Sequence, residues 1–215
     1  MPDLTFAVEG AEAVPFCVTP TIGVKLRVAN RMEDRVHSVA LDCQVRIDAQ
    51  RRRYDEAERR RLAELFGEPA RWSQTLRSLL WTHARASVPP FDDQTTVVLH
   101  VPCTADFNVL AAKYFNALDG GVVPVSLLFS GTVFHAGAGG ALTVARIPWT
   151  AEAAFELPAS VWHELLDLYY PNTTWLTLRM DTYERLLAYR ARHGLLTWEQ
   201  TVDALLACSP EGTPQ

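Results

Sequence analysis

The sequence has little that would take it into or across a membrane. Its longest strongly apolar run, VVPVSLLF at residues 122–129, contains a proline and is far shorter than the roughly 18 residues that a spanning helix needs. The first ten residues, MPDLTFAVEG, lack the basic segment and following apolar segment of a secretory signal. We therefore expect a cytoplasmic protein that does not insert directly into a membrane.

An excess of positive charge is also missing. The 20 Lys and Arg residues against 25 Asp and Glu residues give a formal net charge of −5, which offers no long-range attraction to nucleic acid. The basic triplets at 51–53 and 59–61 are separated by Asp55, Glu56 and Glu58. They therefore predict a solvated charged helix, and no nucleic-acid partner is expected.

The glycine patterns of nucleotide binding are absent. Gly137, Gly139 and Gly140 lie in FHAGAGGALTVARIPW, where the residues after the glycines are β-branched and end in a proline. A dinucleotide fingerprint needs a helix after its glycines, and a P-loop also needs a lysine. The glycines instead predict a hairpin turn, in which glycine readily adopts positive φ, and no cofactor is expected.

The four cysteines and six histidines are dispersed and lack the close spacings of metal or redox motifs, so no metal site is expected. Convergence of His83, His100 and His135 across neighbouring strands is left open. Cys103 with Asp106 could place a thiol near a helix start, which would lower its pKa; alternatively, Cys103 is a small apolar residue at a strand end. The candidates for an enzyme site assembled from distant residues are His83, Cys103, Asp106 and His135.

The sequence does contain several runs in which apolar and polar residues alternate, as in strands with one buried face. The clearest covers residues 38–49, and residues 22–28 are expected to pair with it as an antiparallel hairpin. Because no regular β-α-β order is present, the runs favour an α+β fold whose body, residues 1–150, is an antiparallel β-sandwich or barrel-like. Further strands are expected at 4–8, 75–88, 95–101, 124–135 and 141–147, and short inserted helices at 55–66 and 107–118.

After residue 150 the apolar residues take helical spacing, first from Trp162 onward and then in two helices that begin with capping-box spacing at Asp181 and Thr197. These predict a C-terminal three-helix segment, residues 151–208, packed on the β body as one structural unit. The Pro-rich and Gly-rich tail at 209–215 is expected to be flexible.

Aromatic residues are dense in the last third of the chain. Most are expected in the core between helices and sheet, but Trp, Tyr and Arg are also the residues that anchor interfaces. The candidates for a partner-binding face are Trp175, Tyr189, Arg190 and Arg192.

Four blocks carry a resemblance to a known family: LRSLLWTH (76–83), VPCTADFNVLAAKYFNAL (101–118), PVSLLFSGTVF (124–134) and VWHELLDLYYPNTTWLTLRMDTYERLLAYRARHG (161–194). They resemble an uncharacterised bacterial protein family found in the gene clusters of high-affinity nickel-iron hydrogenases. The resemblance implies a protein partner, either a hydrogenase subunit or a maturation factor, and assigns no catalytic residue.

The combined expectation is a non-catalytic accessory, assembly or interaction protein linked to such a hydrogenase system. The alternative is an enzyme of unknown reaction with a site built from dispersed His, Cys and Asp residues. A metallochaperone ranks below both, because delivery of a soft metal needs clustered cysteines or histidines.

Overall fold

The computed structural model describes residues 3–31, 34–104, 109–173 and 178–208. Within these ranges lie eight strands and six α-helices. The chain divides into two compact units, Met1–Thr173 and Thr174–Gln215. The first contains all eight strands and four of the helices, and the second contains the last two helices.

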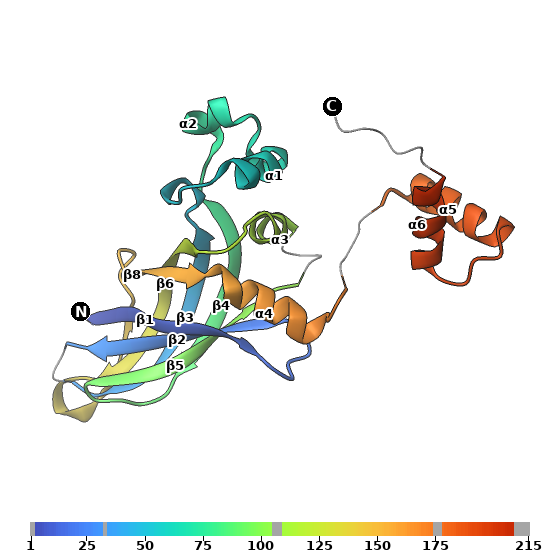
Figure 1. Ribbon diagram of the computed structural model, residues 1–215. Coiled ribbons are helices and arrows are strands. Elements are labelled where there is room, and N and C mark those ends of the chain that lie inside the picture. Colours follow the sequence, from blue (N-terminus) through green and yellow to red (C-terminus); the bar gives the residue numbers. More distant parts are fainter. Residues whose placement is uncertain (1–2, 32–33, 105–108, 174–177, 209–215) are drawn as a thin grey trace. The chain divides into compact units, whose positions relative to one another are not determined.

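Two antiparallel sheets form the body of the first unit (Figure 1). The smaller sheet has the order β1-β2-β5, with β1 Leu4–Val14, β2 Thr21–Asn30 and β5 Gln94–Pro102. The larger has the order β4-β3-β6-β7, with β8 also paired to β6: β3 Val36–Ile47, β4 Leu79–Val88, β6 Val122–Ala136, β7 Leu142–Arg146 and β8 Glu152–Pro158. Contacts between β4 and β5 and between β1 and β8 join the sheet edges. The predicted α+β class with a sandwich or barrel-like body is confirmed.

The predicted hairpin between β2 and β3 is wrong. Strand β2 pairs with β1 and β5, whereas β3 pairs with β4 and β6, so the chain changes sheet between them. Both strands alternate because each turns one face toward the shared core, where Leu26 and Val45 are buried. Alternation alone therefore cannot distinguish a hydrogen-bonded neighbour from a strand in the facing sheet.

Two other boundaries differ from the sequence expectation. The segment 75–88, expected to be a strand throughout, is a strand only from Leu79, and its first residue belongs to the short helix α2, Trp72–Thr75. Strand β8 was not predicted, and its residues pair with the first half of β6. Its alternation is short and runs directly into helical spacing after Pro158, which obscured the strand.

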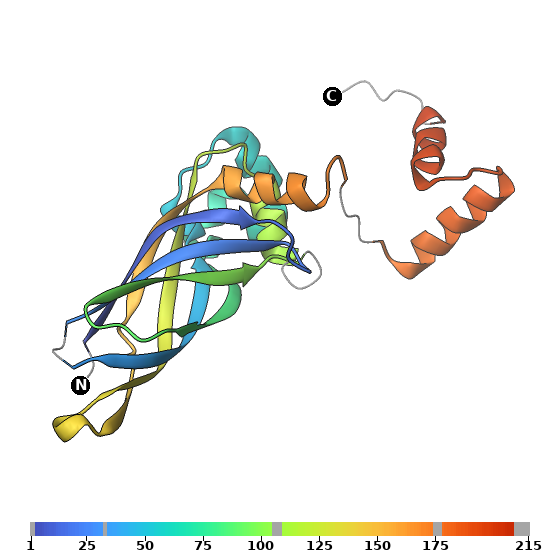
Figure 2. The ribbon, with the colours of Figure 1, turned by 90° about the horizontal axis from the view of Figure 1, so that it is seen from below.

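Helices cover one end of the sandwich. They are α1 Glu56–Phe66, the short α2, α3 Val109–Asn116 and α4 Ala159–Tyr169. Helix α4 continues from β8 and packs against β1 and β2 (Figure 2). An aromatic cluster joins these helices to the sheet: the Trp162 ring stacks on Phe115 with centroids 4.9 Å apart, and Trp81 of β4 lies 5.0 Å from Phe115.

The predicted glycine turn is confirmed. Strands β6 and β7 pair antiparallel across it, and Gly139 and Gly140 have φ of 71° and 80°, which a side chain would disfavour. This hairpin extends from the end of the sandwich far from α4 (Figure 2).

The second unit consists of α5, Met180–Arg192, and α6, Trp198–Ala207. The predicted capping box at Thr197 is confirmed, with Gln200 as its partner. The one at Asp181 is wrong, because the N-cap is Arg179 and Asp181 lies inside the first turn, where it pairs with Arg179 at 2.8 Å. Within the described ranges, no helix is both long and apolar enough to cross a membrane.

Candidate functional site

The histidines nominated for a dispersed catalytic site lie far apart. His83 on β4 is opposite Gln44, and His135 on β6 is opposite Val36, so they are separated by the stretch of β3 between positions 36 and 44. At about 3.3 Å per residue this distance is roughly 26 Å. His83 is also exposed, whereas His135 is buried. The two imidazoles therefore cannot act on one substrate atom.

Cys103 is a buried thiol at the end of β5. Its backbone N–H donates to the Pro20 carbonyl at 2.7 Å. Burial raises the pKa of the Cys103 thiol to about 12, although a backbone hydrogen bond involving Ile22 acts in the opposite direction. The thiol is therefore protonated near neutral pH, which agrees with the interpretation of Cys103 as a small apolar residue at a strand end and not with that of a reactive thiolate. Asp106 lies outside the described residues.

No metal centre replaces these candidates in the part of the chain that the structure describes. There, no three His, Cys, Asp or Glu side chains are grouped so as to hold a metal ion. His100 belongs to β5 in the smaller sheet, away from β6 and His135 in the larger.

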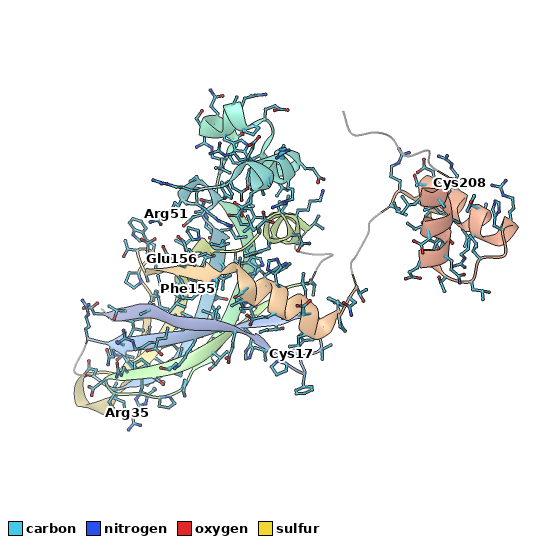
Figure 3. The ribbon with its side chains drawn as sticks, in the orientation of Figure 1. Cys17, Arg35, Arg51, Phe155, Glu156 and Cys208 are labelled. Carbon is cyan, nitrogen blue, oxygen red and sulfur yellow. The ribbon has the colours of Figure 1, made fainter. Side chains whose placement is uncertain are left out.

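A buried carboxylate, Asp48, lies beside a small pocket, and its backbone N–H donates to the carbonyl of Pro124, one of the lining residues, at 2.8 Å. Ser126 donates to its Oδ2 at 2.5 Å and Ser78 donates to its Oδ1 at 3.0 Å. The neighbouring pocket, of about 250 Å³, is lined by Arg51, Pro124, Val125, Ala154, Phe155 and Glu156 (Figure 3). This volume is below the roughly 300–1,000 Å³ of small-molecule sites, and the hydroxyls occupy both Asp48 oxygens. The cluster therefore acts as a structural join between β6 and the start of β4.

A second polar cluster corrects the expectation of a wholly solvated charged helix. Arg52, which is largely buried, pairs with the buried Glu58 at 2.8 Å, and the Glu58 carboxylate also completes a capping box with Asp55 at the start of α1. The hydroxyls of Tyr54 and Tyr114 lie 2.7 Å apart beside this pair, and burial raises the pKa of both tyrosines. The basic triplet within α1, residues 59–61, is exposed as expected.

Sequence reasoning missed the tip loop, residues 15–20 between β1 and β2. Phe16 and Val18 are fully exposed there, and Phe16 has φ of 61°, which is uncommon outside glycine. The Tyr169 hydroxyl of α4 fixes the loop, because it donates to the Val14 carbonyl at 2.7 Å and accepts from the Cys17 N–H at 2.9 Å. The available signal was the pair of apolar residues between two prolines, outside any alternating run.

The face nominated on α5 is partly used inside the second unit. The Arg190 guanidinium lies 4.3 Å from the centre of the Trp198 ring, and the Tyr189 ring lies 4.2 Å from that of His193. Arg192 is exposed, and Trp175 lies outside the described residues. Arg190 thus stabilises the contact between the two helices.

A different face of the second unit carries most of its exposed apolar side chains. We call it the apolar stripe, and its members are between 36% and 69% exposed: Met180, Tyr183, Leu187, Val202, Leu205 and Leu206. At about 100° per residue, Met180, Tyr183 and Leu187 share one face of α5, and Val202, Leu205 and Leu206 share one face of α6. The Tyr183 and Trp198 rings, 5.5 Å apart, connect the two helices.

Comparison with known proteins assigns the chain to a family whose function is unknown. A family model described as a family of unknown function (DUF6084) matches residues 1–213. The chain belongs to this family. No curated protein matches it.

Two solved structures show distant likeness. One is the CARDB domain of a Pyrococcus furiosus protein in complex with di-metal ions, 13% identical, with 73% of this chain and 92% of that chain covered and a TM-score of 0.29. The other is a beta-glucosidase from Kluyveromyces marxianus, 12% identical, with 72% and 15% covered and a TM-score of 0.28. Such low scores inform neither the fold nor the function of this chain.

Proposed function

We propose that this chain is a non-catalytic accessory or interaction protein whose second unit binds a partner protein. The observation that carries the proposal is the apolar stripe. A contiguous exposed apolar surface marks an interaction site far more often than isolated exposed residues do. Burying one such side chain contributes about 1.5–3 kcal/mol, so a few well-covered members are enough for a specific complex.

The partner class follows from the family resemblance. The blocks at 76–83, 101–118, 124–134 and 161–194 resemble proteins encoded beside high-affinity nickel-iron hydrogenases. We therefore propose a cytoplasmic hydrogenase subunit or maturation factor as the partner. The net charge of −5 argues against a nucleic-acid partner.

The test is an affinity purification of tagged full-length protein from its native host after mild crosslinking. The wild-type chain is compared with Leu187→Ser/Leu206→Ser on the apolar stripe. Hydrogenase subunits or maturation proteins should co-purify with wild type and fall to the untagged background with the stripe variant. A far-UV spectrum of the variant verifies that α5 and α6 remain helical.

Two further variants control for loss of exposed apolar surface as such. Leu142→Ser/Val144→Ser removes exposed side chains from β7, and Phe16→Ser/Val18→Ser removes them from the tip loop. Both should retain the partner. If the stripe variant retains it too, the second unit is not the binding site, and loss in the tip-loop variant would move the site to residues 15–20.

A further inference from the structure

The second unit has almost no interior of its own. Among its described residues only Thr201 is buried, and its hydroxyl is bonded to the Thr197 carbonyl within α6. A unit near the lower limit of about 40 residues normally needs additional stabilisation, since it buries too little apolar surface. The hairpin is therefore suited to gain stability when a partner covers its apolar stripe.

Acidic residues border the apolar stripe on both helices. Glu184 follows Met180 by four positions and precedes Leu187 by three, and Glu199 precedes Val202 by three, so each carboxylate is a surface neighbour of stripe residues. Both glutamates are exposed, and neither forms an ion pair with any residue that the structure describes. The stripe thus has an uncompensated negative border.

The basic side chains of α5 lie elsewhere. Arg185 and Arg192, seven positions apart, share a face roughly opposite the apolar stripe, and Arg190 is held over the Trp198 ring. Helix α6 contains Glu199 and Asp203 and no Lys or Arg. Neither helix therefore has a Lys or Arg of its own placed to neutralise Glu184 or Glu199, and Arg179, the N-cap of α5, pairs with Asp181.

We propose that the apolar stripe binds a basic amphipathic helix, whose apolar residues at i, i+3, i+4 and i+7 cover the stripe and whose flanking Lys or Arg side chains pair with Glu184 and Glu199. Helices commonly bind apolar surfaces in this mode. Charge complementarity at the border adds specificity and association rate. The inference rests on the proposed function, because it specifies the chemistry of the partner at the same surface.

A second copy of the chain fits this surface less well. A symmetric dimer would pair the apolar stripe of one copy with the identical stripe of the other, and so with the same acidic border. The glutamates of both copies would then lie at one interface border, where like charges oppose association. The observed charges therefore favour a basic partner over self-association.

The test uses the full-length chain and two synthetic amphipathic peptides with the same leucine face. One peptide has lysines beside that face, and the other has glutamates. Titration calorimetry at 0.15 M salt should show that the lysine peptide binds at least roughly 10-fold more tightly than the glutamate peptide. This is about the effect expected when two partly exposed ion pairs with Glu184 and Glu199 replace two repulsions. Glu184→Lys/Glu199→Lys should reverse the preference.

A matched variant separates local from overall charge. Glu152→Lys/Glu156→Lys makes the same charge change on exposed β8 positions of the first unit and should leave the preference for the lysine peptide intact. If this variant reverses the preference as well, binding reflects net charge and the proposal is wrong.

The remaining outcomes distinguish the two proposals. Equal binding of both peptides, lost in Leu187→Ser/Leu206→Ser, would overturn the basic-helix assignment and leave the binding function of the stripe standing. Both proposals would be overturned if neither peptide binds and if the host partner co-purifies equally well with the wild type and with Leu187→Ser/Leu206→Ser. A stable wild-type dimer in sedimentation, dissociated by Leu187→Ser, would overturn the basic-helix assignment in favour of a second copy.

Discussion

The two units of the chain differ in how much apolar surface they bury. In the first, residues from both sheets and from helices α1, α3 and α4 form one continuous core, and the largest side chains in it, such as Trp162 and Phe115, are almost inaccessible. In the second, two helices of ordinary length meet mainly through Trp198 and leave the apolar stripe open. The comparison indicates that the first unit is stable by itself, whereas the second depends on what covers it.

The largest expected effect of a single substitution lies in the aromatic cluster. Trp162→Ala removes the ring stacked on Phe115 and the hydrogen bond from Trp162 Nε1 to Asn116 at 2.9 Å. We expect a loss of about 3–5 kcal/mol in the free energy of unfolding of the first unit. Urea unfolding followed by near-UV circular dichroism measures it.

The matched change in the second unit is Leu187→Ala, at a side chain that is 39% exposed. Because much of Leu187 already contacts water, its removal should cost less than about 1 kcal/mol. A comparable loss at both positions would mean that the second unit is as tightly packed as the first, contrary to the comparison above.

An intermediate effect is expected from buried thiols at alkaline pH. Cys43 is buried on β3, and burial raises the pKa of its thiol from 9.0 to about 12. A raised folded-state pKa stabilises the fold fully below pH 9, and this contribution is lost as the pH rises toward 12. The stability deficit of Cys43→Ala relative to wild type should therefore shrink by about 1.4 kcal/mol between pH 8 and pH 10.

Cys208, exposed after α6, gives the control for this pH effect. Cys208→Ala should change stability equally at pH 8 and pH 10, because this substitution removes an exposed side chain and no buried group. Denaturant titrations at both pH values measure the two differences. A deficit of Cys43→Ala that stays constant with pH would show that water reaches the β3 thiol in the folded state.

How far the sequence predicts this molecule depends on the range of the interaction. Local signals worked: the alternation of β3, the glycine turn after His135 and the capping box at Thr197 each depend on residues close together in the chain. Strand β2 pairs with β5 and not with β3 because β3 belongs to the facing sheet. Apolar and polar residues alternate in the same way whether two successive strands share a sheet or lie in facing sheets, so the sequence pattern cannot tell the two arrangements apart.

The candidate sites follow the same division. Composition and residue spacing could not reveal that His83 and His135 lie roughly 26 Å apart along β3, because that separation depends on how the strands pair. The half of the apolar stripe on α5 could have been predicted from the sequence, since Met180, Tyr183 and Leu187 recur at helical spacing. The helices of this segment were expected to pack on the β body, and only the structure reveals that no described part of its own unit covers this face.

The smallest expected effect tests one motif in both units. Capping boxes begin α1 at Asp55 and α6 at Thr197, so removing either cap deletes the same hydrogen bond to the third helical residue, which typically stabilises a helix by about 1 kcal/mol. Helix α1 is also held by the buried side chains of Leu62 and Phe66, whereas α6 buries only Thr201. Asp55→Ala should therefore leave amide exchange in α1 nearly unchanged, and Thr197→Ala should raise it throughout α6.

Hydrogen exchange by mass spectrometry on the full-length variants reads both helices in one experiment, with β3 peptides as the internal reference. The free energy of local unfolding determines how fast the amides of each helix exchange. Losing about 1 kcal/mol of N-cap stabilisation therefore changes exchange visibly only in a helix whose local unfolding already costs little free energy. Adding the lysine peptide should then suppress exchange in α6 of Thr197→Ala, because the bound helix covers the apolar stripe. Equal exchange in α1 and α6 before any peptide is added would mean that the second unit is folded without a partner, and the reason for expecting a covering helix would be lost.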